Sequence, residues 1–268
     1  MRSVLLLAAS VVAIPCLAQP AEDSTPRAAS ERESFEWRQT ASLTAAEARQ
    51  AAAADQQFIY AIGSREIAKY DRKTGERVAL SIGAATHLNS GFFWQGQLYC
   101  AHSNYPARPE LSEILVLDPV SMKLSEFHRF AAQPGSLTWA VRHDDAWWCN
   151  FAFYDADNAK SYLARFDDRW KERARWTYPA ELVAKLGRHS LSGGLWYGDE
   201  LLATDHDNPV IYRLRVPTKG EVLELVAIEP APFAGQGIAV DPLTAGLVGV
   251  VRKKSLVVFA ERWAAADR

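Results

Sequence analysis

Three histidines border apolar stretches of the sequence and are the first candidates for chemistry. His87 precedes the stretch LNSGFFW, His102 follows QLYCA, and His206 lies in the tripeptide DHD. Imidazole nitrogens together with carboxylate oxygens are a common ligand set for divalent metals such as zinc. We therefore expect His87, His102 and His206 to hold a divalent metal, zinc or calcium, with Asp205 or Asp207 as the general base.

A second interpretation of these histidines remains open at this stage. The sequence contains no compact ligand motif such as HExxH. Histidines that only form hydrogen bonds around a water-filled opening would leave the same pattern. His189, next to Ser190, is a reserve candidate for the site.

Further polar residues occupy equivalent places at the ends of apolar stretches, and we expect them to bind a small polar substrate. They are Asn89, Ser90, Asn104, Ser136, Asn150, Ser192, Gln236 and Arg252. Arg252, followed by Lys253, is suited to holding an anionic group. The alternative is that about half of these residues only satisfy backbone groups at strand ends, as Asn and Ser often do.

A repeated module must position these residues. Its clearest copy is QQFIYAIGSREIAKYDRKTGERVAL, in which strand patterns are separated by turns rich in Gly, Asp and Ser. The same order recurs in later parts of the chain. Repeats of four strands, roughly 40 to 55 residues long, are typical of β-propeller blades.

The last repeat has only three strands, GQGIAV, GLVGVV and SLVVFA. The missing outer strand is predicted at residues 35–40 (FEWRQT), which would remove an open sheet edge. The chain is thus predicted to be all-β: a single five-bladed β-propeller domain over residues 35–265, its last blade closed by an N-terminal outer strand. Residues 44–49 are expected to form a turn of helix before a small-residue strand, and PAELVAKLG a short helix.

Strand alternation sorts the connections between two faces of such a ring. Connections between blades, and those between the second and third strand within a blade, share one face, which we call the top face. The candidate histidines, aspartates and polar residues all fall in or beside these connections. We therefore expect an axial pocket on the top face.

The N-terminus has the features of a secretory signal peptide, predicted over residues 1–18. Arg2 precedes an apolar run at residues 4–14, followed by Pro15 and small residues up to Ala18. Residues 19–34 are predicted to be a disordered linker. These features indicate a periplasmic or secreted protein, without a membrane association after signal cleavage. Cys100 and Cys149 are then expected to be buried free thiols, because their equivalent places in two repeats would not bring them face to face.

Charge argues against one class of partner. The chain has 30 basic and 32 acidic residues and a formal net charge of −2. Without a basic excess, binding to the phosphate backbone of nucleic acid is not expected. A monomer that binds a small polar molecule is predicted instead.

Two short motifs resemble a known family. SLTW at residues 136–139 and GQGIAVDPLTAGLVGV at residues 235–250 are similar to blade motifs of the glutamine cyclotransferase type of five-bladed propeller. The whole pattern also resembles a set of uncharacterised secreted bacterial propellers. The resemblance implies five blades and an axial top-face site. In the cyclotransferases a catalytic Glu follows the LY of the second blade's second strand, whereas Cys100 follows Leu98 and Tyr99 here, so the resemblance does not imply that activity.

Two classes of function remain. The first is an enzyme, metal-assisted, that hydrolyses, cyclises or cleaves a small polar substrate as a hydrolase, cyclase or lyase. The second is a non-catalytic ligand-binding or protein-interaction scaffold, because propellers serve both purposes and fold does not decide function.

Overall fold

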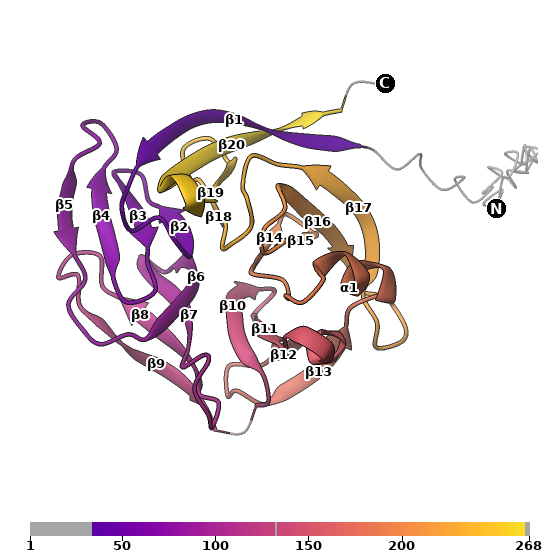
Figure 1. Ribbon diagram of the computed structural model, residues 1–268. Coiled ribbons are helices and arrows are strands. Elements are labelled where there is room, and N and C mark those ends of the chain that lie inside the picture. The colour runs from indigo at the N-terminus through magenta and orange to yellow at the C-terminus, as the bar shows by residue number, and fades with distance from the viewer. Residues whose placement is uncertain (1–33, 132, 266–268) are drawn as a thin grey trace, which may run out of the picture. The chain divides into compact units, whose positions relative to one another are not determined.

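The computed structural model describes residues 34–131 and 133–265, which form five four-stranded antiparallel sheets arranged in a ring (Figure 1). This confirms the predicted all-β, five-bladed propeller. The predicted signal peptide and, except for Ser34, the predicted linker lie outside the described residues. Within the described part, no helix is long and apolar enough to span a membrane.

Each blade runs from an inner strand at the axis to an outer strand at the rim. Blade 1 contains β2 (Ala51–Ala54), β3 (Phe58–Ile62), β4 (Ile67–Asp71) and β5 (Arg77–Leu80). Blade 2 contains β6 (His87–Trp94), β7 (Gln97–Ser103), β8 (Ser112–Leu117) and β9 (Leu124–Phe130). Blade 3 contains β10 (Ser136–His143), β11 (Ala146–Ala152), β12 (Tyr162–Phe166) and β13 (Glu172–Thr177). Blade 4 contains β14 (Gly193–Tyr197), β15 (Glu200–Thr204), β16 (Val210–Arg215) and β17 (Glu224–Pro230).

Blade 5 is built from both ends of the described chain. Its strands are β18 (Ala239–Val240), β19 (Leu247–Val251), β20 (Leu256–Ala264) and, outermost, β1 (Phe35–Thr44). β1 pairs antiparallel with β20 along its whole length, from Phe35 opposite Ala264 to Thr44 opposite Leu256. The predicted closure by an N-terminal strand is therefore confirmed, and the strand is longer than the six residues expected.

Local sequence explains how the strands turn. Gln95 and Gly96 join β6 to β7 with positive φ angles of 49° and 77°, which a two-residue turn matching the strand twist requires. Residues 46–49 form turns, and the small residues of β2 then follow as a fully buried strand at the axis. The predicted helix is α1 (Ala180–Leu186), with Pro179 before it and Gly187 after it. Two 3-10 helices, η1 (Asp155–Lys160) and η2 (Arg252–Lys254), lie in connections between second and third strands.

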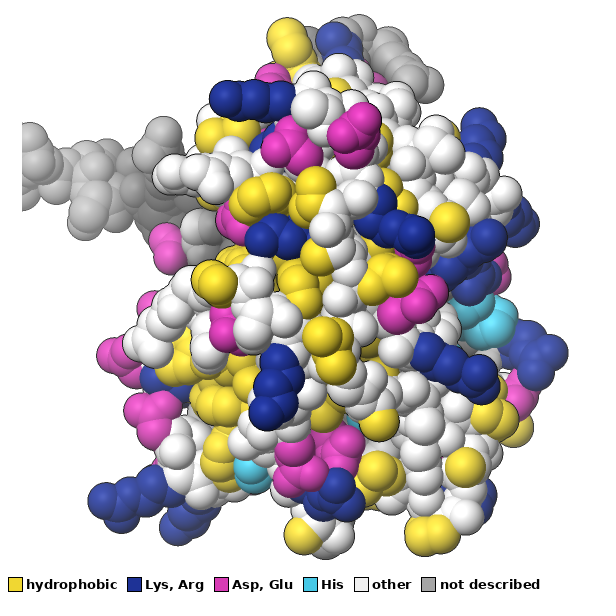
Figure 2. Space-filling model, turned by 90° about the vertical axis from the view of Figure 1, so that its left-hand side faces the viewer, with side chains coloured by type: hydrophobic (Ala, Val, Ile, Leu, Met, Phe, Trp, Pro, Cys, Tyr) yellow, Lys and Arg dark blue, Asp and Glu magenta, His cyan; other side chains and the backbone are white. Residues whose placement is uncertain are grey.

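Aromatic and aliphatic side chains fill the space between neighbouring blades. Trp139 of β10 is fully buried against Gly194 of β14, where a Cβ atom would lie 2.5 Å from the indole. Cys100 and Cys149 are buried free cysteines, as predicted. Figure 2 shows the rim on the side of blade 1, where acidic, basic and hydrophobic side chains are interspersed. The side chains packed between neighbouring blades hold the inner strands in fixed positions around the axis.

Candidate functional site

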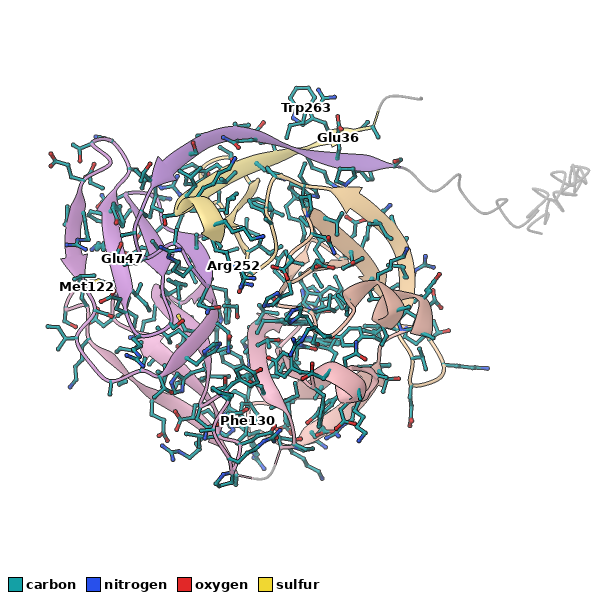
Figure 3. All side chains as sticks on the ribbon, in the orientation of Figure 1. Glu36, Glu47, Met122, Phe130, Arg252 and Trp263 are labelled. Carbon is teal, nitrogen blue, oxygen red and sulfur yellow. The ribbon has the colours of Figure 1, made fainter. Side chains whose placement is uncertain are left out.

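A polar pocket of about 200 Å³ lies on the top face, where the inner strands begin. Six residues predicted from the sequence line it: His87, Asn89, Ser192, His206, Gln236 and Arg252. Six further residues complete the wall: Gln50, Tyr105, Thr138, Tyr154, His189 and Ser190. Figure 3 shows Arg252 near the centre of the ring of blades. All five blades or their connections thus contribute polar groups to one axial pocket.

Asp207 links two of the lining residues. Its Oδ2 lies 2.9 Å from Nδ1 of His206, and its Oδ1 accepts a hydrogen bond of 2.6 Å from Arg252 Nη2. The hydrogen bond from His206 and the nearby guanidinium lower the pKa of Asp207 to about 2. Because an ionised carboxylate can only accept hydrogen bonds, Nδ1 of His206 must be the donor. The lone pair of the neutral ring is therefore on Nε2.

His189 stacks on His206, with ring centroids 3.8 Å apart and an interplanar angle of 7°. His189 Nε2 is also 3.7 Å from Asp207 Oδ2. Burial lowers the pKa of His206 below its usual value of 6.5, despite the opposing effect of Asp207. Two stacked imidazoles beside a carboxylate form a compact group of titratable side chains.

These three residues fit the donor set of a divalent metal. Among the described residues, His189, His206 and Asp207 are the group of His, Cys, Asp and Glu whose ligand atoms all lie within 4.8 Å of one another. Two nitrogens and one carboxylate oxygen are a ligand set that zinc uses in open, catalytic sites. Parallel rings direct their lone pairs side by side, so convergence on one ion requires one ring to turn.

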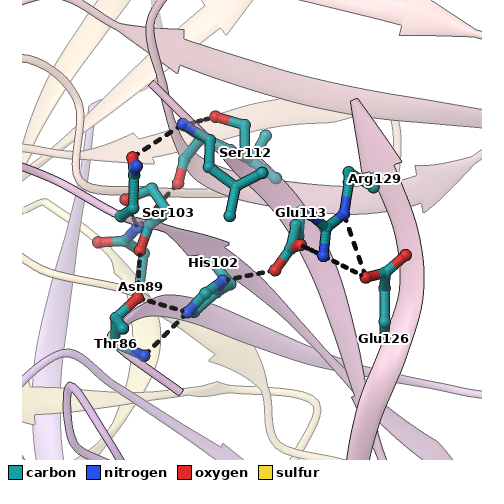
Figure 4. Close-up of polar contacts among 11 residues, drawn as sticks. Thr86, Asn89, His102, Ser103, Ser112, Glu113, Glu126 and Arg129 are labelled. Carbon is teal, nitrogen blue, oxygen red and sulfur yellow. Dashed lines mark hydrogen bonds and ion pairs between the residues drawn. The ribbon is translucent and has the colours of Figure 1, made fainter. Parts of the chain in front are cut away.

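The expected set of His87, His102 and His206 is not brought together. His102 is buried within blade 2, where Nδ1 lies 3.0 Å from Oε2 of Glu113 and Nε2 accepts the backbone N–H of Thr86 (Figure 4). Burial and the charge of Arg129 lower the pKa of His102 to about 4. The ring is thus a neutral structural group that does not line the pocket. His87 does line the pocket, where burial lowers its pKa.

Asp205 supports the site without lining it. Its Oδ1 accepts hydrogen bonds from the backbone N–H groups of Asp207 and Asn208, and its Oδ2 accepts one of 2.8 Å from the Tyr212 hydroxyl. Burial raises the pKa of Asp205, but these hydrogen bonds outweigh burial and leave the pKa below its usual value. Asp205 therefore fixes the turn that presents His206 and Asp207, and its oxygens are occupied.

Four of the predicted substrate-binding residues also lie outside the pocket wall. Asn150 is fully buried, donates to the Thr138 hydroxyl and accepts from Tyr178. Asn104 closes its own loop through Pro109 and Leu111. Ser90 and Ser136 are buried. For Asn150 and Asn104, the alternative considered from the sequence, satisfaction of nearby polar groups, describes their contacts.

Two tyrosines of the wall were missed by reasoning from strand ends. Tyr105 and Tyr154 lie in connections that the alternation rule assigns to the top face, and their rings are 4.7 Å apart. Burial raises the pKa of Tyr154 to about 12, which keeps its hydroxyl protonated. Reading each connection to its end, instead of only its first residues, would have included both.

A larger cavity of about 620 Å³ opens at the other end of the axis. Its walls include Phe92, Trp94 and Trp196, with few polar groups. The Asp55 carboxylate in this wall already accepts three hydrogen bonds, and Arg142 forms an ion pair with Asp168. The smaller top-face pocket is the better candidate for chemistry, because three histidines line it and Asp207 contacts two of its lining residues.

Comparisons with known proteins agree with this fold. No protein-family model matches the chain, and no curated protein matches it by sequence. The crystal structure of Myxococcus xanthus glutaminyl cyclase is similar with a TM-score of 0.59 and 8% identity, over 88% of this chain and 100% of that chain. A chain from the crystal structure of a mitotic checkpoint complex is similar over 95% of this chain and 99% of its own, with 9% identity. Its TM-score of 0.46 is too low to support an inference. The resemblance to cyclotransferase-type propellers is thus confirmed for the fold.

Proposed function

We propose that the top-face pocket binds a divalent metal ion at His189, His206 and Asp207 and is the active site of an enzyme that acts on a small polar molecule. The observation that carries this proposal is the grouping of these three ligand atoms within 4.8 Å, beside an axial polar pocket. Of the three ligands expected from the sequence, the proposal keeps His206. His189 and Asp207 take the places of His87 and His102. It covers hydrolases, cyclases and lyases.

The residues of the chain have distinct roles in this proposal. A bound metal would polarise a carbonyl or lower the pKa of water. Asp207, ionised at neutral pH, would exchange its hydrogen bond with Nδ1 of His206 for the metal, while Arg252 continues to hold its other oxygen. Asn89, Ser192 and Gln236 line the pocket and offer hydrogen bonds to a polar substrate. Asp207 serves as a ligand and not as the general base, since a pKa of about 2 makes it a weak base.

Metal binding by the purified full chain tests the proposal. We expect stoichiometric zinc by elemental mass spectrometry, and at least about tenfold weaker binding in His206→Ala and Asp207→Asn, because each removes one ligand. His128→Ala is the matched control, since His128 also stacks on an aromatic ring, that of Trp170 at 3.7 Å, but does not line the pocket. The proposal fails if zinc, calcium and manganese all leave the wild type unoccupied.

A non-catalytic ligand-binding protein is the second candidate. Two observations favour it: Asp207 is already bonded to His206 and Arg252, and the parallel rings do not converge on one point. This candidate predicts that small polar ligands raise the melting temperature without being converted. Product analysis by mass spectrometry after incubation with each stabilising ligand separates the two candidates.

The proposal further places the protein in the periplasm or outside the cell, as a monomer. Support comes from the signal-like sequence of residues 1–18. Fractionation of expressing cells tests the location, and light scattering of the purified chain tests the monomer. Retention of the full-length chain in the cytoplasm would contradict the proposed location.

A further inference from the structure

A second recess adjoins the top-face pocket. It has a volume of about 400 Å³ and is lined by Arg49, Gln50, Ser64, Arg252 and Lys253. Gln50 and Arg252 line both spaces, so the recess and the pocket share a wall. A molecule that reaches past these two side chains would contact both the pocket and the recess.

The charge of this recess is one-sided. Three of its five lining side chains are cationic and none is acidic. Arg252 is paired with Asp207, whereas Arg49 and Lys253 form no ion pair with a carboxylate within the described part of the chain. The chain as a whole carries a formal charge of −2, so its composition does not account for this local excess.

Arg49 is held in place by backbone groups. Its Nη1 donates to the carbonyl oxygen of Arg252 at 3.0 Å and its Nε to that of Ala46 at 3.3 Å. Beside it, Gln50 Nε2 donates to the Ser64 hydroxyl at 3.0 Å. A guanidinium has five N–H donors, so the two carbonyl bonds leave three for a ligand. A positioned guanidinium favours oxyanions such as carboxylate and phosphate, which it can contact with two parallel hydrogen bonds.

We propose that the substrate of the top-face pocket carries an anionic group, a carboxylate or a phosphate, that binds in this recess between Arg49 and Lys253. This inference rests on the proposed function of the pocket and narrows its substrate class. Arg252 connects the two parts, because it lines both the recess and the pocket and contacts Asp207. The reacting part of the substrate then lies beside His206.

Titration with two simple anions tests the inference. Inorganic phosphate and succinate are added separately to the full chain at low ionic strength, and binding is measured by calorimetry. We expect at least one to bind, with about tenfold weaker affinity in Arg49→Gln and Lys253→Gln, because each loses a charge-assisted contact. The tighter of the two anions identifies the chemistry of the group.

Lys254→Gln is the matched control, because Lys254 is the exposed neighbour of Lys253 and does not line the recess. An equal loss in Lys253→Gln and Lys254→Gln would overturn the inference, since it would show unspecific attraction to a basic surface. Binding of neither anion to the wild type would also overturn it. Lys253 has no hydrogen bond through its side chain within the described residues, so its variant separates lost binding from lost folding.

Metal titration of the same proteins separates this inference from the proposed function. Anion binding that is lost in Arg49→Gln supports the recess even if no metal binds, in which case only the metal proposal fails. Zinc binding without anion binding leaves the metal proposal standing and overturns the anionic substrate. Arg49→Gln should bind zinc as the wild type does, because Arg49 contacts none of the three proposed ligands.

Discussion

Nδ1 of His102 lies 3.0 Å from Oε2 of Glu113, on the neighbouring strand of blade 2. Glu113 contacts Arg129 on the next strand, and Nε2 of His102 accepts the backbone N–H of Thr86. A chain of polar contacts thus crosses blade 2 from the connection before β6 to the outer strand (Figure 4). Protonation of His102 at Nε2 would break the bond to Thr86, which agrees with the lowered pKa.

The first prediction concerns the pH dependence of stability. The unfolded chain takes up a proton on His102 near pH 6.5, and the folded chain only near pH 4. This contribution to stability is therefore fully present above pH 6.5 and is lost as the pH falls from 6.5 to 4. A shift of this size corresponds to about 3 kcal/mol. Urea unfolding between pH 4 and 8 measures the effect.

His102→Gln is the control for this prediction, because glutamine does not titrate. The variant should be less stable at pH 7 and should lose less stability on acidification. The pKa values of His87, His128 and His206 are also lowered by burial, so a smaller dependence of the same sign should remain. Identical pH profiles for variant and wild type would contradict the role assigned to His102.

The second prediction concerns the contact between blades 3 and 4. In Gly194→Ala the new Cβ would lie 2.5 Å from Cε2 of the buried Trp139, so the indole or the strand must shift. We expect a loss of about 1 to 3 kcal/mol in the free energy of unfolding. Gly63→Ala is the matched control, since its nearest contact is an ordinary 3.4 Å. Equal stabilities of the two variants would show that the blades adjust without cost.

The third prediction concerns closure of the ring. Trp37 of β1 is buried, donates from Nε1 to Glu229 at 2.9 Å and packs edge-on against Tyr197. Trp37→Ala should lower the free energy of unfolding by about 3 to 5 kcal/mol. Trp263→Ala, at a half-exposed position of β20, should change it by less than about 0.5 kcal/mol. Chemical unfolding of both variants gives the comparison.

The fourth prediction concerns Cys100, at the position where the sequence resemblance to the cyclotransferases would place a Glu. Cys100 is fully buried in hydrophobic contacts and its Sγ would lie 3.2 Å from a Cβ on Gly91, so the site has no room for a longer side chain. Cys100→Glu should destabilise the protein by several kcal/mol, because it buries an unpaired carboxylate. Cys100→Ala should remain folded. A Cys100→Glu protein with the same melting temperature as the wild type would refute this account of the position.

The sequence was sufficient to predict the blades, because turns and alternating strands recur with one order. It also predicted the closing strand, because the last repeat lacks a fourth one. Strand alternation placed the polar connections on one face, and the candidate pocket lies on that face. The direction of individual side chains could not be obtained in the same way. His102 and Glu113 are opposite each other only through the register of β7 and β8, which the sequence does not state. Similarly, His189 reaches His206 because the connection after α1 brings it there.

The pairing of β1 with β20 also has a consequence for the order in which the protein can be completed. β1 is made before the other described strands, yet its partner, β20, is the last of them. Blade 5 therefore cannot be finished until β20 has been made. A chain that crosses a membrane with its N-terminus leading would stay open until β20 had crossed, and would close only on the far side.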